Sequence, residues 1–134
     1  MKIFLDTADT EVIKKYFSTG LVDGVTTNPT LIMKSGRNPE DVYEDIRDMG
    51  VKDISMEVIG NTDDMIAEGI RLYQKFGEVC TVKVPCTREG LEACKKLSDL
   101  GIKVNVTLIF CAAQAVLAAK AGATYVSPFV GRLD

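Results

Sequence analysis

The chain has 134 residues, of which 46% are hydrophobic and 26% charged, a balance typical of a single globular domain covering residues 1–134. The net charge of −3 gives no basic excess for nucleic acid, and no apolar run approaches the roughly 20 residues that span a bilayer. The N-terminus shows no signal-peptide pattern, so the cytoplasm is the expected location.

Short β-type runs alternate with segments of helical periodicity along the whole chain. Asn38 with Pro39 and, later, Thr87 are suited to begin helices, while Gly77 and Gly101 are suited to end them. Strands are predicted at 3–6, 22–26, 54–58, 80–84, 102–106 and 124–127. Helices with apolar faces are predicted around 12–17, 39–49, 65–76, 88–100 and 112–120.

Strands that alternate with helices predict consecutive right-handed βαβ units around a parallel sheet, in either a (β/α) barrel or an open doubly wound sheet. Polar residues decide between the two, because a barrel places function at the C-terminal ends of many strands. Nearly every predicted strand carries such a residue at or near its C-terminal end: Asp6, Thr26, Asn28, Glu57, Lys83, Asn105, Thr107 and Ser127. No G-x-G-x-x-G or Walker A motif supports a nucleotide site. We therefore expect a (β/α) barrel.

Histidine is absent, and the four cysteines form no C-x-x-C pair. A zinc site of the usual Cys/His kind is thus not expected. Serine–histidine and cysteine–histidine catalysis are excluded because no imidazole can act as base. We expect neither metal nor cofactor, and acid–base chemistry must use carboxylates, lysine, tyrosine or water. The cysteines are expected to pack as small hydrophobes or to lie exposed and unreactive.

Lys83 is the strongest chemical signal, because it lies within the apolar strand-like run Val-Lys-Val-Pro. Parallel strands are normally buried on both faces. Burial disfavours an ammonium ion and releases the neutral amine, which can attack a ketone to form an imine. The alternative is a lysine whose head reaches water at the strand end, and the residue pattern favours neither.

Two acids lie in similarly apolar runs, where a carboxylate is costly unless it is paired or functional. Asp6 could move a proton during carbon–carbon cleavage, although a capping or turn role before Asp9 is the simpler interpretation. Glu57 could activate a water held by Thr107, or could be an outward-facing strand residue.

Three further positions carry weaker signals. The Thr-Thr-Asn-Pro sequence at 26–29 is typical of a turn. Asn105 needs hydrogen-bond partners if its strand is buried, and a bound polyol would supply them. Arg132 suits a phosphate, although a solvated arginine is the commoner outcome.

Six motifs in one order resemble the transaldolase family, especially its short bacterial and phage forms related to fructose-6-phosphate aldolase. They are FLDTAD, GVTTNPTL, ISMEV, VKVPCTREGL, VNVTLIF with the following AAQA, and SPFVGR, and they run from Phe4 to Arg132. The resemblance implies a (β/α)8 barrel and transfer of a dihydroxyacetone unit from fructose 6-phosphate or sedoheptulose 7-phosphate. The implied acceptors are aldose phosphates such as erythrose 4-phosphate or glyceraldehyde 3-phosphate, which places the reaction in the pentose phosphate pathway.

The same resemblance implies residue roles. Lys83 matches the Schiff-base lysine, Asp6 the acid–base aspartate, and Glu57 with Thr107 the pair that positions the catalytic water. The sugar is expected to contact Thr26, Asn28, Asn105 and Ser127, and its phosphate Arg132. The aldolase sister family typically has Gln in place of Glu57 and Tyr in place of Phe129, so this chain resembles a transaldolase at both positions.

The sequence ends at Asp134, after the sixth predicted strand of an eight-stranded fold. About six βα units are therefore expected, with open strand edges that favour homo-oligomers. Three interpretations stay open: a fragment of a longer enzyme, a truncated form whose copies complete each other's barrels, or a silent barrel that acts only through self-association.

Overall fold

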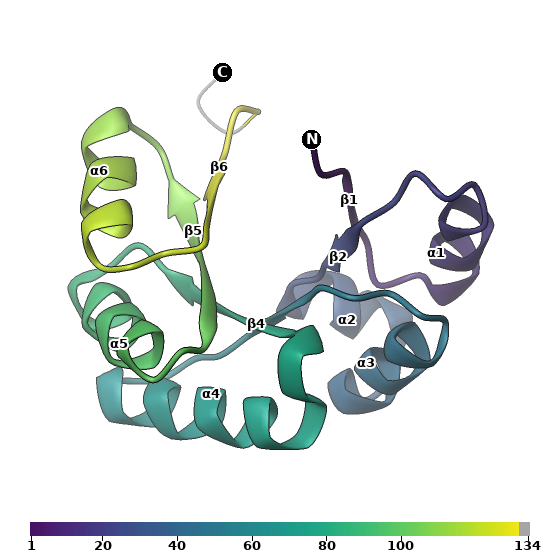
Figure 1. Ribbon diagram of the computed structural model, residues 1–134, viewed down its shortest axis with the longest axis horizontal. Coiled ribbons are helices and arrows are strands. Elements are labelled where there is room, and N and C mark those ends of the chain that lie inside the picture. The colour runs from purple at the N-terminus through teal and green to yellow at the C-terminus, as the bar shows by residue number, and fades with distance from the viewer. Residues whose placement is uncertain (132–134) are drawn as a thin grey trace. The chain divides into compact units, whose positions relative to one another are not determined.

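The structure of the protein, a computed structural model, describes residues 1–131 and contains two compact units (Figure 1). The first unit comprises Met1–Glu57 and Glu78–Cys80, and the second comprises Val58–Gly77 and the chain from Thr81 onward. Strands and helices alternate in both units, as the sequence predicts.

The first unit contains three parallel strands in sequential order. They are β1 (Phe4–Asp6), β2 (Gly24–Thr26) and β3 (Ile54–Glu57). Helix α1 (Thr10–Phe17) connects β1 to β2, and two helices, α2 (Pro29–Ser35) and α3 (Pro39–Asp48), lie between β2 and β3. Helix α3 contacts both α1 and β3. The hydrophobic core of this unit is formed by side chains with no exposed surface, among them Ile13, Val25, Val42, Ile46 and Ile54.

The remaining elements lie in the second unit, except that Glu78–Cys80, which are part of a 3-10 turn and of the strand after it, belong to the first. Helix α4 (Thr62–Phe76) and the 3-10 turn η1 (Gly77–Val79) precede β4 (Cys80–Pro85), which is followed by α5 (Arg88–Asp99), β5 (Lys103–Ile109), α6 (Ala112–Lys120) and β6 (Tyr125–Pro128). Strand β5 pairs in parallel with β4 and β6. Helices α4, α5 and α6 pack against one another in that order, and α5 and α6 cover β5 (Figure 1).

Strand burial explains why these runs are uniformly apolar. Every residue of β4 from Cys80 to Val84 is buried, and Val82, Val84, Val104 and Val106 have no exposed surface. Parallel strands covered by helices show this pattern. Six parallel strands that alternate with helices form six βα units of a (β/α)8 barrel fold, which confirms the fold predicted from the sequence.

The predicted secondary structure differs from the structure at two places: one helix is predicted as a turn, and one strand is predicted too short. The Asn-Pro sequence begins helix α2 instead of a simple turn, because Asn28 is the N-cap and Pro29 is the first helical residue. The helix is only seven residues long and ends at Gly36, which has a left-handed φ of 70°. Strand β5 runs to Ile109 through an irregular register, three residues beyond the predicted end.

Candidate active site

Lys83 is buried at the centre of β4, with only 6% of its surface exposed. Its carbonyl oxygen accepts a hydrogen bond of 3.0 Å from the backbone N–H of Val58, which fixes the strand locally. Of the two positions that the sequence leaves open for this lysine, the structure therefore shows the buried one.

Asn105 is the register partner of Lys83 on the neighbouring strand β5. Its amide is almost fully buried, with 2% exposed, and the hydroxyl of Ser127 on β6 donates a 2.8 Å hydrogen bond to Oδ1. The protein itself thus meets part of the hydrogen-bonding need that the sequence assigns to a bound polyol. Strands β4, β5 and β6 together bring Lys83, Asn105 and Ser127 into one cluster.

Thr107 lies two residues after Asn105 and so extends from the same face of β5. Its side chain is 2% exposed, and its Oγ1 is the only buried side-chain nitrogen or oxygen in the described residues without a hydrogen-bond partner. A buried hydroxyl without a partner is unfavourable, and a water or ligand oxygen would relieve it.

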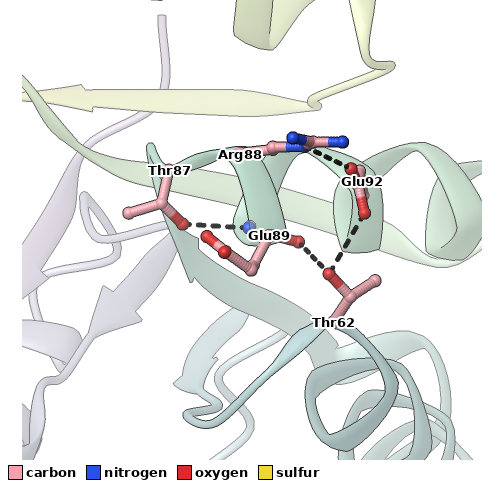
Figure 2. A network of polar contacts seen from close by, with 6 residues as sticks. Thr62, Thr87, Arg88, Glu89 and Glu92 are labelled. Atoms are coloured by element: carbon pink, nitrogen blue, oxygen red, sulfur yellow. Dashed lines mark hydrogen bonds and ion pairs between the residues drawn. The ribbon is translucent and has the colours of Figure 1, made fainter.

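The segment after β4 is fixed by contacts at the start of α5. The Thr87 hydroxyl accepts a 3.0 Å hydrogen bond from the N–H of Gly90, as expected for an N-cap. Figure 2 shows the polar network next to this cap, in which Arg88 Nε donates to Glu92 Oε1 (3.1 Å). The Thr62 hydroxyl, at the start of α4, lies 3.2 Å from the Glu89 carbonyl oxygen and 3.3 Å from Glu92 Oε2. The first turns of α4 and α5 are thereby joined.

In the first unit, Asp6 and Thr26 are register partners at the ends of β1 and β2. The Thr26 hydroxyl donates a 2.9 Å hydrogen bond to Oδ1 of Asp6. The N-cap of α1 is Asp9, whose carboxylate accepts from the backbone N–H groups of Glu11 and Val12. Asp6 therefore has no capping role at α1, and its carboxylate is exposed at the strand end.

Two further predicted site residues lie in this unit: Asn28 is the N-cap of α2, and Glu57 is the last residue of β3. The Asn28 side chain accepts a 2.9 Å hydrogen bond from the N–H of Leu31 and so begins α2. Glu57 is half-buried at the end of β3. Burial raises the pKa of Tyr43, on α3, to about 12, and the charge of the Glu57 carboxylate acts in the same direction. The hydrogen bond between Tyr43 and Thr27 acts in the opposite direction and lowers this pKa.

Phe129 follows β6, where its N–H donates a 2.9 Å hydrogen bond to the Ile109 carbonyl oxygen. Its ring lies edge-on to that of Phe110, with centroids 5.6 Å apart and planes at 60°. Phe110, which ends the VNVTLIF motif, is not among the predicted site residues, because an aromatic residue after a strand gives no separate signal. Arg132, the predicted phosphate ligand, lies outside the described residues.

Residues 3–134 match the family model described as Transaldolase/Fructose-6-phosphate aldolase. The chain belongs to this family. A protein named "Probable transaldolase" from Nitrosopumilus maritimus (strain SCM1) is 57% identical over 136 residues, covering 100% of this chain and 60% of that protein. A "Probable transaldolase" from Caulobacter vibrioides (strain NA1000 / CB15N) is 58% identical over 135 residues, with 100% and 62% covered. The chain thus spans about 60% of the length of these relatives.

A solved structure supports the fold of this transaldolase/fructose-6-phosphate aldolase family member. The carboxyl transferase domain of Rhizobium etli pyruvate carboxylase, with oxamate and biotin, aligns with a TM-score of 0.57. The alignment covers 94% of this chain and 26% of that chain at 16% identity, so the similarity concerns the fold alone.

The cysteine thiols of this family member give no sign of a reactive or metal-binding site. Burial raises the pKa of the Cys94 thiol to about 11 and, together with the charge of Cys111, also raises the pKa of Cys86. In the described part of the chain, no group of three or more cysteine, aspartate or glutamate side chains could hold a metal ion. No helix between residues 1 and 131 is long and apolar enough to cross a bilayer.

Proposed function

We propose that this chain is a class I, Schiff-base transaldolase with Lys83 as the nucleophile. It moves a dihydroxyacetone unit from fructose 6-phosphate or sedoheptulose 7-phosphate to erythrose 4-phosphate or glyceraldehyde 3-phosphate. The family membership supports this class of substrate, and the burial of Lys83 supports the covalent mechanism. No metal or cofactor takes part in the proposed reaction.

The observation that carries the proposal is the position of Lys83 on β4. Its Nζ would attack the C2 carbonyl of the ketose, and the carbonyl oxygen would leave as water, which forms the imine. Residues Cys80 to Val84 of this strand are buried, so the proposed imine would form in a site shielded from bulk water. The neighbouring amide of Asn105, oriented by Ser127, offers hydrogen bonds to sugar hydroxyl groups.

Acid–base steps are assigned to groups on other strands. Asp6 would accept the proton of a sugar hydroxyl group, and the carbon–carbon bond would break as that proton leaves. The Thr26 hydroxyl holds the Asp6 carboxylate through the 2.9 Å hydrogen bond. Glu57 would exchange a proton with the water that forms and hydrolyses the imine, and Thr107 Oγ1 would hold that water. Asn28 would contact the sugar, Phe129 would keep the imine dry, and Arg132 would bind phosphate.

Borohydride trapping tests the covalent step. The 134-residue chain is mixed with fructose 6-phosphate and sodium borohydride, and peptides are mapped by mass spectrometry. We expect a reduced sugar adduct on Lys83. Lys83→Arg keeps the positive charge but cannot form the imine, so this variant should carry no adduct. Lys103→Arg, on the neighbouring strand β5, is the matched control and should still be labelled at Lys83. A folded wild-type chain without an adduct at Lys83 would contradict the proposal.

A second candidate is fructose-6-phosphate aldolase, because the matching family includes both activities. Glu57 and Phe129 favour transaldolase, since the aldolase sisters typically have Gln and Tyr there. The two reactions differ in their need for an acceptor. A transaldolase releases glyceraldehyde 3-phosphate from fructose 6-phosphate efficiently only when erythrose 4-phosphate is present, whereas an aldolase releases it without an acceptor.

The proposal also includes a cytoplasmic location, a place in the pentose phosphate pathway, and self-association. Apolar residues on the outer strands are exposed, including Ile3 next to β1 and Val126 on β6. Exposed strand edges favour association with other chains. Light scattering on the purified chain tests this part. A monomer with one cooperative thermal transition would argue against self-association and against a silent barrel that acts only through it.

A further inference from the structure

Strand β5 has an irregular backbone immediately after Thr107. On its β4 side the ladder is regular through the pair Pro85–Thr107, and the N–H of Cys86 then donates a 2.9 Å hydrogen bond to the Thr107 carbonyl oxygen. On its β6 side the register shifts between Val106 and Ile109. There β5 advances by three residues while β6 advances by two, from Val126 to Pro128, so β5 contains one extra residue.

Leu108 occupies this bulge in the left-handed region, with a φ of 61°. It is the only non-glycine residue with positive φ among residues 1–131. A leucine is unfavourable there, because its Cβ lies too close to the following carbonyl oxygen, and glycine or asparagine would fit more easily. Strained conformations of this kind persist where the surrounding structure holds them, and they cluster at functional sites.

The residues on either side of the bulge link the conformation of Leu108 to the candidate active site. Thr107, which precedes it, has the buried Oγ1 without a hydrogen-bond partner. Phe110, which follows it, contacts the ring of Phe129, and the N–H of Phe129 donates to the Ile109 carbonyl oxygen on the far side of the bulge. The ladders thus hold both sides of Leu108, and the direction of the Thr107 side chain depends on the backbone between them.

We propose that Leu108 is a positioning residue: its left-handed conformation directs the Thr107 hydroxyl toward the water that forms and hydrolyses the imine. This inference rests on the proposed function. In that reaction the ketose C2–O bond breaks as the Lys83 imine forms, the oxygen leaves as water, and the reverse reaction adds a solvent oxygen to C2. Leu108 acts on this exchange through Thr107 and touches no reacting atom.

Imine formation and hydrolysis are the steps that should depend most on the direction of the Thr107 hydroxyl. Their rate is measured as the exchange of the C2 oxygen of fructose 6-phosphate with isotopically labelled water. Leu108→Ile keeps the side-chain volume, but its β-branched side chain strongly disfavours positive φ. Leu108→Asn is of similar size and accepts that conformation. We expect Leu108→Ile to slow exchange on the order of tenfold to a hundredfold, as for a misplaced catalytic group. Leu108→Asn should stay within about threefold of the wild type.

A double-mutant cycle separates positioning from a general structural effect. In a Thr107→Val background, Leu108→Ile should slow exchange no further, because the hydroxyl that Leu108 directs is already gone. Leu91→Ile, at a half-buried leucine with an ordinary helical backbone, is the matched control and should leave exchange unchanged. Lys83→Arg supplies the background rate.

The outcomes distinguish the two claims. Wild-type exchange no faster than that of Lys83→Arg rejects the proposed function and this inference with it. Rapid wild-type exchange that Leu108→Ile leaves unchanged rejects only the positioning role. Equal losses from Leu108→Ile with and without the Thr107 hydroxyl also reject that role. If Leu108→Ile does not fold, the comparison of Leu108→Asn with the wild type decides, and a loss as large as that of Thr107→Val would overturn the inference.

Discussion

Gly90, in the first turn of α5, lies against the carbonyl oxygen of Pro85 at the end of β4, so closely that a Cβ at position 90 would clash with that oxygen. The same carbonyl accepts a 2.9 Å hydrogen bond from the N–H of Thr87. The helix therefore reaches the strand end that follows Lys83 only because residue 90 has no side chain. The position of the proposed nucleophile and the packing of α5 depend on one another.

Gly90→Ala is expected to destabilise the chain and to lower turnover. Alanine gains about 0.5–1 kcal/mol in a helix, but relieving the clash requires a backbone shift that costs roughly 1–3 kcal/mol. We expect a net loss centred on about 1 kcal/mol, and at most about 2.5 kcal/mol, in the free energy of unfolding, measured with urea. Gly131→Ala is the control, because a Cβ there meets no atom within 4 Å. Equal stability of the two variants would contradict the packing argument.

The hydrogen bond between Thr26 and Asp6 should matter more for turnover than for stability. Thr26→Val keeps the side-chain shape but leaves Oδ1 of Asp6 without its donor. Because the pair is exposed, we expect a change in unfolding free energy of less than about 1 kcal/mol. A misdirected general base should nevertheless lower kcat about tenfold. Thr19→Val removes another exposed hydroxyl hydrogen bond, to the Tyr16 carbonyl oxygen, and should leave kcat unchanged.

Much of the fold could be predicted because strands β2 to β5 are mostly buried and the helices between the strands have clear caps. The N-cap roles of Asn38 and Thr87 follow directly from residue type. Helix α2 could not be separated from a turn, because Asn28 and Pro29 are equally suited to both and only seven residues follow the cap. Local sequence decides where an element begins more readily than how far it continues.

The candidate site was predictable to a different degree. The apolar run around Lys83 suits both a buried lysine and one whose head reaches water, so only the structure decides that Lys83 is buried. The hydrogen bond from Ser127 to Asn105 depends on strand register, which no local pattern fixes. The left-handed conformation of Leu108 has no sequence signal at all, because leucine normally avoids it. It is imposed by the mismatch between the two ladders of β5.

Tyr43 should make the protein less stable at alkaline pH. Burial raises the pKa of its phenol from 10.0 to about 12 in the folded chain. A raised pKa stabilises the folded state below pH 10, and this contribution is lost as the pH rises through 12, since only the unfolded phenol ionises in that interval. Each pH unit should cost about 1.4 kcal/mol. Tyr43→Phe should reduce the slope of unfolding free energy against pH, whereas Tyr16→Phe, at an exposed tyrosine, should leave this slope unchanged. Identical slopes in wild type and Tyr43→Phe would show that the buried phenol does not control alkaline stability.

Phe129→Tyr should shift the reaction from transfer toward hydrolytic release. The added hydroxyl lies on a half-buried ring that contacts Phe110, and it would bring a hydrogen-bonding group to a position that phenylalanine keeps apolar. We expect more free dihydroxyacetone from fructose 6-phosphate without an acceptor, and a lower ratio of transfer to release when erythrose 4-phosphate is present. Phe110→Tyr adds the same hydroxyl to the partner ring, which is 38% exposed, and should change this ratio much less. If both variants change it equally, general wetting of the aromatic pair explains the shift better than a specific role of position 129 in holding water away from the imine.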